Sequence, residues 1–246
     1  MTLIVTGGGR GIGAATARMA ASRGFEVAVN YARDAVAAER VVAEIRDGGG
    51  RAVAVQSDVS AEADVIRLFA TAEQELGPVR ALVNNAGVTG GFSRVDEVSA
   101  RVVERVFAVN VVGAFLCARE AVRRMSTLRG GAGGSIVNVS SRAARLGGPG
   151  EWVHYAASKG ALDSLTTGLA AEVAGEGIRV NGVAAGLIET DLHAAAGRPT
   201  RARDLAPGVP MGRPGTPAEV AEAILWLLSP AASYVTGAIT AVSGGR

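Results

Sequence analysis

Short apolar runs alternate with longer segments of helical periodicity along the whole chain. The apolar runs have the length of buried strands and lie at 2–6, 25–30, 52–56, 81–83, 135–139, 178–184 and 238–242. The segments between them predict helices at 12–22, 35–47, 61–76, 97–125, 153–174 and 218–228. Apolar strands that alternate with helices indicate an α/β fold, a doubly wound parallel sheet with helices on both faces.

Polar residues and proline mark where several of these elements begin, break or end. Asp34 and Ser60 each precede a helical segment and are predicted to be N-caps. Asn110 interrupts the long segment 97–125. Residues 187–217 are rich in proline, which predicts an irregular lid over the site. We see no internal repeat and no linker, so we expect one domain that spans residues 1–246.

Charge and cysteine content narrow the class of protein. The formal net charge is only +2, and no block of like charge predicts nucleic-acid binding. Cys117 is the single cysteine, so no disulfide can form within the chain, which fits a reducing compartment. No apolar run approaches the ~20 residues of a membrane span, and the first strand leaves no room for a signal peptide after Met1. No His/Cys/Asp cluster suggests a metal, and we expect a cytoplasmic protein.

A glycine-rich turn joins the first predicted strand to the first predicted helix. Gly7, Gly9, Gly11 and Gly13 let the backbone approach a pyrophosphate, and the helix start at Ile12 offers free N–H donors to its negative charge. The spacing differs by one inserted residue from the G-x-G-x-x-G fingerprint, and such a turn can also be merely tight. No Gly-Lys-Ser/Thr follows, which disfavours a P-loop. The position between strand and helix favours a Rossmann-type dinucleotide site.

The end of the second strand bears on the choice between NAD and NADP. An acidic residue there would bind the ribose 2′-hydroxyl of NAD, but the neutral Asn30 takes that place and Tyr31 follows it. Arg10 and Arg33 could instead pair with a 2′-phosphate, or could be plain surface charge. Asp34 complicates this interpretation, but its position favours a helix cap. We predict NADP, with NAD as the less favoured cofactor.

Tyr155 and Lys159 are four residues apart and would lie side by side on one helix. An ammonium near the phenol favours the phenolate, so the pKa of Tyr155 is expected to fall toward working pH, as suits a general acid/base. Lys159 is the single lysine among 25 Lys and Arg residues, and arginine cannot replace a small, deprotonatable cation. Ser140 or Ser141 could hold a carbonyl or alcohol oxygen nearby. An ordinary Tyr/Lys pair on a solvated helix is the alternative.

Together these residues resemble the short-chain dehydrogenase/reductase family, in its single-domain branch. The likeness covers essentially the whole chain, and four blocks carry it: Thr6-Gly7…Gly11-Ile12-Gly13, Asn84-Asn85-Ala86-Gly87, Ser140-Ser141 with Tyr155 and Lys159, and Ile178-Arg179-Val180-Asn181. The chain departs from the family in two places. One extra residue separates serine from tyrosine, so the family spacing would put Arg142 in the place of the serine. Ala185 stands where proline is common.

The resemblance implies roles for individual residues. Tyr155 would be the acid/base, Lys159 would lower its pKa and bind the nicotinamide ribose, and Ser141 would steady the substrate oxygen. Asn110 would support a water that relays protons to Lys159. Asp58 with Val59 would meet the adenine; Asn84, Ala86 and Gly87 would line the ribose side; Gly186, Ile188 and Thr190 would contact the nicotinamide amide. Asp58 as a helix cap, Asn84 as a turn former and Thr190 as a loop residue are the structural alternatives. Homo-oligomers, tetramers or dimers, are also implied.

Substrate contacts are expected from the loop 149–154 and from the lid. Trp152 could form an apolar wall, and Glu151, His154 and His193 could meet polar groups. The sequence thus predicts an NADP(H)-dependent oxidoreductase that interconverts a carbonyl and a secondary alcohol. A sugar, a 3-oxoacyl thioester or a general ketone is the candidate substrate. A non-catalytic NADP-binding regulator is the alternative, and an epimerase or dehydratase of the longer branch ranks below both.

Overall fold

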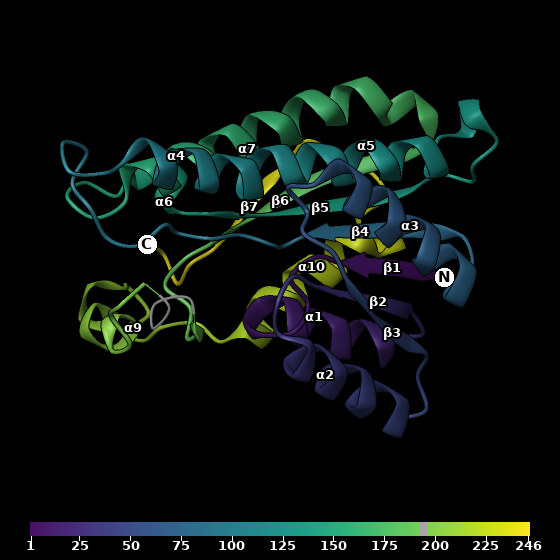
Figure 1. Ribbon diagram of the computed structural model, residues 1–246, viewed down its shortest axis with the longest axis horizontal. Coiled ribbons are helices and arrows are strands. Elements are labelled where there is room, and N and C mark those ends of the chain that lie inside the picture. Colours follow the sequence, from purple (N-terminus) through teal and green to yellow (C-terminus); the bar gives the residue numbers. More distant parts are fainter. Residues whose placement is uncertain (192–195) are drawn as a thin grey trace.

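The structure is a computed structural model, and it describes residues 1–191 and 196–246. The described part of the chain forms one parallel sheet with the strand order β3-β2-β1-β4-β5-β6-β7. In chain order the strands are β1 (Thr2–Val5), β2 (Glu26–Tyr31), β3 (Ala52–Gln56), β4 (Val79–Asn84), β5 (Gly134–Ser141), β6 (Ile178–Ala185) and β7 (Ile239–Val242). This confirms the predicted doubly wound sheet (Figure 1).

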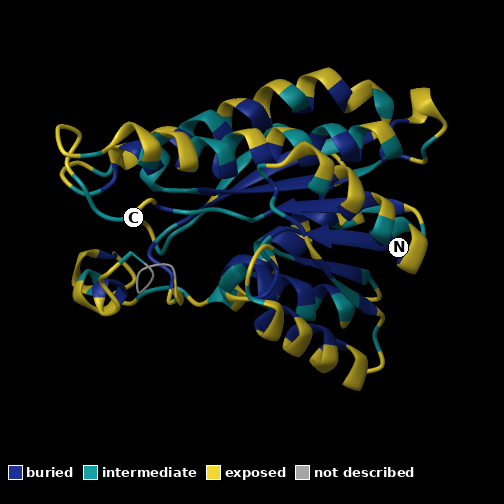
Figure 2. Ribbon diagram, in the orientation of Figure 1, coloured by how far each residue is buried: buried dark blue, intermediate teal, exposed yellow. Residues whose placement is uncertain are grey.

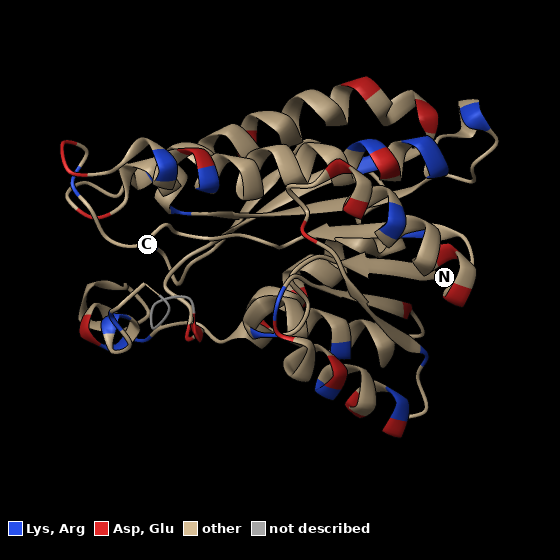
Figure 3. Ribbon diagram, in the orientation of Figure 1, with Lys and Arg blue, Asp and Glu red and all other residues tan. Residues whose placement is uncertain are grey.

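Helices cover both faces of this sheet. One face carries α1 (Gly11–Ala21), α2 (Ala35–Asp47) and α10 (Pro217–Leu228); the other carries α3 (Glu62–Leu76), α5 (Gly113–Met125) and α7 (Val153–Val173). Successive residues of β1 serve opposite cores, since Leu3 and Val5 pack with α1 while Ile4 packs with α3. The inner strands are accordingly buried over most of their length, whereas the edge strands β3 and β7 are partly exposed (Figure 2). Charges of both signs are interspersed over the helices (Figure 3).

The predicted boundaries needed few changes. Asp34 caps α2 as expected, its Oδ1 accepting from the backbone nitrogen of Ala37 at 3.0 Å. Ser60 was expected to cap α3, and this prediction is wrong. The nitrogen and the hydroxyl of Ser60 both donate to Asp58 Oδ1, and the N-cap of α3 is Ala61, which makes no side-chain cap. Ser60 therefore holds Asp58 in place.

The long segment before β5 is broken where the sequence suggested. It consists of α4 (Ala100–Phe107), a π-helical turn (Ala108–Val112) that contains Asn110, and then α5. π-helical turns inside helices often mark functional sites. The segment 187–217, which was expected to be irregular, contains a short helix, α9 (Arg201–Asp204). Two other residues of this segment, Ile188 and Gly215, form an isolated parallel β-bridge.

The topology determines where a ligand can bind. The chain leaves β1 toward β2 and β3, then crosses back to β4, so the strand order reverses between β1 and β4. Ligands of such sheets bind beyond the carboxyl ends of the strands at this reversal. The glycine-rich turn follows β1 and the Asn84-Asn85-Ala86-Gly87 block follows β4. Figure 1 shows α9 apart from the sheet, on the side of the molecule where β1 ends.

Candidate active site

The glycine-rich turn is held by the end of β2. The backbone nitrogen of Gly7 donates to Asn30 Oδ1 at 3.1 Å, and Asn30 Nδ2 donates to the carbonyl and the hydroxyl of Ser57 at 3.0 and 2.8 Å. A carboxylate could not donate to the Ser57 carbonyl oxygen, so an amide at position 30 positions the turn. A Cβ added to Gly13 would lie 2.5 Å from the carbonyl oxygen of Gly7 and from Asn85 Nδ2. Only glycine fits there.

A cavity of about 1090 Å³ extends from this turn to α9. Its size suits a dinucleotide with a small substrate beside it. The expected site residues that line it are Gly7, Gly9, Arg10, Gly11, Ile12, Asn30, Tyr31, Arg33, Asp58, Val59, Ala86, Gly87, Ser141, Trp152, Tyr155, Lys159, Gly186, Ile188 and Thr190.

Gly13, Asn84 and Asn110 were also expected at the site but do not line the cavity. Asn84 Nδ2 donates to the carbonyl of Ala114 and to Asn138 Oδ1, so this side chain joins β4 to α5 and β5. Asn110 accepts from the nitrogen of Val88 at 2.8 Å and donates to its carbonyl at 2.9 Å. It orders the segment after β4.

Tyr155 and Lys159 lie together at the centre of the cavity, both buried on α7. Lys159 Nζ is 5.8 Å from the centroid of the Tyr155 ring and donates to the carbonyl of Val139 at 2.7 Å. Ser141 lines the same cavity, and its hydroxyl acts to lower the pKa of Tyr155. The end of β5 therefore orients both residues.

The two serines before α6 (Ala143–Leu146) have different surroundings. Ser140 is buried, and its hydroxyl donates to Asp163 Oδ1 at 2.5 Å and to the carbonyl of Lys159 at 3.4 Å. Ser141 Oγ accepts from the nitrogen of Ala143 and contacts Tyr155. Arg142, which the family spacing would have selected, turns its Nε to the carbonyl of Arg246.

Burial dominates the pKa values of the pair. It raises the pKa of Tyr155 to about 12, against the opposing effect of the hydrogen bond with Ser141. It lowers the pKa of Lys159 to about 8, against the opposing charge of Asp163. The expected fall in the tyrosine pKa is thus not present in the protein alone, because desolvation of the phenolate outweighs the lowering effect of Ser141. A phenol that stays protonated near neutral pH can donate a proton to a carbonyl oxygen.

Charged side chains gather at the end of the cavity next to the glycine-rich turn. Arg10 Nε is 3.8 Å from Asp34 Oδ2, and both side chains are largely exposed. Arg33, also exposed, lines the same part of the cavity. Burial acts to raise the pKa of Asp58, but hydrogen bonds from Ser60 and Arg105 outweigh it and lower that pKa. The site thus keeps two exposed arginines and an ionised carboxylate.

Trp152 forms one wall of the other end of the cavity. Its ring stacks on Phe92 at 4.7 Å between centroids and lies 5.4 Å from the Tyr155 ring. Glu151 pairs with Arg198 and Arg201. His154 is buried, and its Nε2 is hydrogen-bonded to the carbonyl of Thr89 at 2.8 Å, so this ring nitrogen is already used. His193 lies outside the described residues.

Sequence reasoning missed several residues of this end of the site. Phe92, Arg201 and Leu205 come from segments that only the fold brings together. No local spacing signals such a contact. Within residues 1–191 and 196–246 there is no group of three or more His, Cys, Asp or Glu that could hold a metal ion. No helix there is both long and apolar enough to cross a membrane.

The chain is similar to known proteins along nearly its whole length. A family model described as enoyl-(acyl carrier protein) reductase matches residues 7–246. An uncharacterized oxidoreductase, YgfF of Escherichia coli (strain K12), is 51% identical over 99% of this chain and 98% of its own length. Glucose 1-dehydrogenase 2 of Bacillus subtilis is 38% identical over 99% of this chain and 93% of its own. The crystal structure of a 3-ketoacyl-(acyl-carrier-protein) reductase from Brucella melitensis, complexed with NADH, aligns with a TM-score of 0.91 at 35% identity, over 100% of this chain and 97% of that one.

Proposed function

This chain belongs to the short-chain dehydrogenase/reductase family, and from that premise we propose that it is an NADP(H)-dependent oxidoreductase that interconverts a carbonyl and a secondary alcohol. Oxidoreductase activity and a nicotinamide cofactor follow from the family itself. The observation that carries the rest is the placement of Tyr155, Lys159 and Ser141 around one point of the cavity.

The residues of the glycine-rich turn fit a dinucleotide. Positive φ angles at Gly7 (62°) and Gly11 (52°) curve the backbone around the cavity, and the tight packing at Gly13 brings the start of α1 close to it. Gly7, Gly9 and Gly11 would hold the pyrophosphate, and Ile188 and Thr190 would hold the nicotinamide amide. The bound cofactor supplies or accepts the hydride.

The protein's own part in the reaction is proton transfer and positioning. In the reductive direction Tyr155 donates its phenolic proton to the substrate oxygen, and Ser141 holds that oxygen by a hydrogen bond. Lys159 places a positive charge beside the phenolate that forms and so favours the transfer. Asn110 orders the wall behind Lys159. On family likeness we propose that Asn110 also supports a water molecule that relays protons to Lys159.

The preference for NADP rests on charge. Asn30 carries no charge to repel a 2′-phosphate, and Arg10 and Arg33 are both exposed at the cavity edge. Asp34 lies beside Arg10 but its Oδ1 already caps α2. A dianionic phosphate between two arginines would make charge-assisted hydrogen bonds that the 2′-hydroxyl of NAD could not match.

For the substrate we propose the classes of compound that the relatives suggest. One relative is named for glucose and one structural neighbour for a 3-ketoacyl thioester, so sugars, 3-oxoacyl thioesters and simple ketones are all candidates. We also propose a lid over the site near residues 187–217, from its proline content, and a single domain in a cytoplasmic protein, from the sequence pattern and the single cysteine. Family likeness supports a homo-oligomer. Gel filtration with light scattering would test the oligomer.

The decisive experiment is a turnover screen. Purified protein is assayed with NADPH and with NADH against aldehydes, ketones, sugars and 3-oxoacyl thioesters, and with the oxidised cofactors against the matching alcohols. We expect turnover of at least one carbonyl/alcohol pair, with NADPH favoured. Tight binding of NADPH without turnover of any pair would instead favour the non-catalytic NADP-binding regulator.

A further inference from the structure

Three segments that are distant in sequence meet at the Trp152 end of the cavity. Phe92 comes from the segment after β4, Glu151 and Trp152 come from the turn before α7, and Arg201 comes from α9. The guanidinium carbon of Arg201 lies 4.5 Å from the Trp152 ring centroid and 5.6 Å from that of Phe92. Since Trp152 also contacts Tyr155, Arg201 lies one side chain away from the proposed proton donor.

Arg201 is buried without a full set of partners. Its side chain is only 9% exposed, and its Nη2 pairs with Glu151 Oε2. Its Nε is buried and has no acceptor among the described residues. A buried guanidinium normally uses its donors, because an unsatisfied one costs free energy. An incompletely satisfied arginine that lines a substrate cavity suggests that a ligand supplies the missing acceptors.

The local charge is also unbalanced. Arg198 Nη1 lies 3.2 Å from Glu151 Oε1, so one carboxylate serves two guanidinium groups. The cluster of Arg198, Arg201 and Glu151 therefore carries one more positive than negative charge, and at the buried Arg201 electrostatic interactions are stronger than in water.

We propose that Arg201 selects carbonyl substrates that carry an anionic group, a carboxylate above all. The carbonyl is at Tyr155 and the carboxylate is held at the guanidinium, beside Glu151. Trp152 lines the cavity, contacts both Tyr155 and Arg201 and provides the apolar surface between the two ends. Phe92 stacks on Trp152. This inference rests on the proposed function, because it adds a substrate class to the same site.

The competing explanation is purely structural: the Arg201–Glu151 ion pair could only fasten α9 to the turn before α7. The two explanations predict opposite results for the two halves of the pair. If Arg201 binds an anion, removing the charge of Glu151 improves anionic substrates, and removing that of Arg201 impairs them. If the pair is only a fastening, both changes impair every substrate alike.

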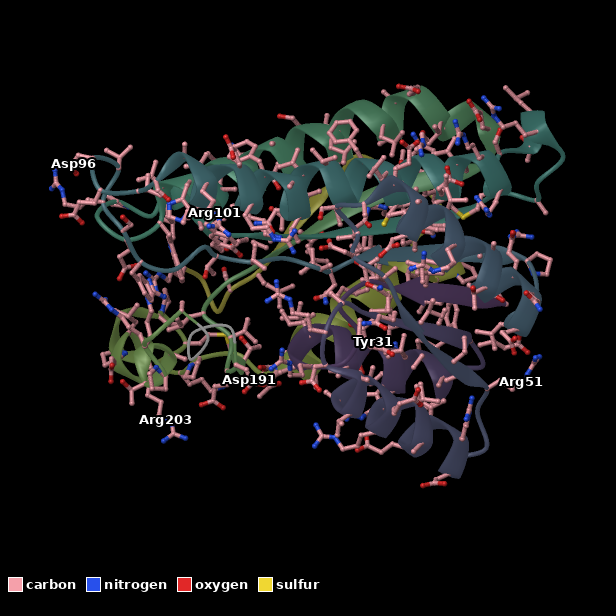
Figure 4. All side chains as sticks on the ribbon, viewed as in Figure 1. Tyr31, Arg51, Asp96, Arg101, Asp191 and Arg203 are labelled. Atoms are coloured by element: carbon pink, nitrogen blue, oxygen red, sulfur yellow. The ribbon has the colours of Figure 1, made fainter. Side chains whose placement is uncertain are left out.

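The experiment compares oxocarboxylates with their methyl esters, for example 4-oxopentanoate and 4-oxocyclohexanecarboxylate, in wild type, R201Q, R201K and E151Q. The measured quantity is the ratio of kcat/KM for acid over ester. R201Q should lower this ratio about 10- to 100-fold, the worth of a hydrogen bond to a charged group. R201K should retain part of the preference, and E151Q should raise the ratio. R203Q is the matched control: Arg203 is exposed on the same helix, and Figure 4 shows it extending away from the sheet, so its ratio should not change.

Equal losses for acid and ester in R201Q, or a lowered ratio in E151Q, would overturn the proposal. Failure of the proposed function looks different, since no acid and no ester would then turn over with either cofactor. In that case calorimetric titration of 4-oxopentanoate decides the matter. Weaker binding to R201Q than to wild type and R203Q supports the anion site, and equal binding or none refutes it.

Discussion

Lys159 Nζ lies 5.8 Å from the ring centroid of Tyr155, on the same side of α7. The four-residue spacing brings both side chains to the face that packs against β5. There Lys159 Nζ donates a hydrogen bond to the carbonyl oxygen of Val139, and the Ser141 hydroxyl acts to lower the pKa of Tyr155. Val139 and Ser141 are two residues apart, so they share one face of the strand. One strand end thus aligns the whole proton-transfer group.

Replacing Tyr155 by phenylalanine removes the proton donor and keeps the ring that contacts Trp152. We expect kcat to fall at least about 100-fold, the lower end of what general acid catalysis contributes. The affinity for NADPH, measured by fluorescence titration, should stay within about threefold of wild type, since the ring that packs in the site is kept. Activity within about tenfold of wild type would exclude Tyr155 as the acid.

The two serines provide an internal comparison. Ser141→Ala removes the hydroxyl that contacts Tyr155, and we expect a loss of kcat of about 10- to 100-fold with little change in stability. Ser140→Ala removes the donor to Asp163 and should chiefly lower the free energy of unfolding, by about 1 kcal/mol. Steady-state kinetics and urea unfolding of both variants check this. The reverse pattern would assign the substrate contact to Ser140.

Local pattern was sufficient for the sheet because each strand contains a short apolar run and each connection begins or ends with a recognisable turn. It failed at Ser60, where two hydrogen bonds to Asp58 are worth more than a helix cap. A residue that can bond either to a helix end or to a neighbouring carboxylate has the same sequence signature in both cases. Only the position of Arg105, which also binds Asp58, shows that the carboxylate is part of a larger cluster.

The site shows a similar division. Tyr155 and Lys159 were predictable because one helix fixes their relation. The pKa of Tyr155 was not predictable, since it depends on how completely Trp152 and the rest of the cavity exclude water. The contact between Arg201 and Phe92 could not be predicted, because it joins α9 to the segment after β4 and local sequence periodicity carries no information about such a contact.

Burial of Lys159 makes stability depend on pH. Its pKa is about 8 in the folded protein and 10.5 in its ordinary state, so between these values the unfolded chain binds more protons. Stability therefore rises with pH in this window, and the contribution is constant below about pH 8. By about pH 9.5 the wild type should gain about 2 kcal/mol relative to Lys159→Met, which has no proton to lose. Urea midpoints of the two proteins across this pH window measure the gain, and parallel curves would contradict it.

Arg10 and Arg33 should distinguish the two cofactors. Alanine at either position removes a partner for a 2′-phosphate, so we expect the Kd for NADPH to rise about 10-fold or more while that for NADH changes less than about twofold. Arg40→Ala is the control, since Arg40 is exposed on α2 and does not line the cavity. Titration of each variant with both cofactors provides the test. Equal weakening of NADPH and NADH would remove the charge argument for NADP.

Asp34 has two roles that can be separated by choosing the substitution. Its Oδ1 caps α2, and its Oδ2 lies 3.8 Å from Arg10 Nε. The substitution Asp34→Asn would keep the cap, because asparagine and aspartate cap equally well, but would release Arg10 from the negative charge. D34N should therefore unfold like wild type and bind NADPH about 2- to 5-fold more tightly, the worth of an exposed ion pair. D34A should gain the same affinity but lose about 1 kcal/mol of stability with the cap. If D34N instead weakened NADH and left NADPH unchanged, the carboxylate would itself be a ligand of the ribose 2′-hydroxyl, and NAD would become the favoured cofactor.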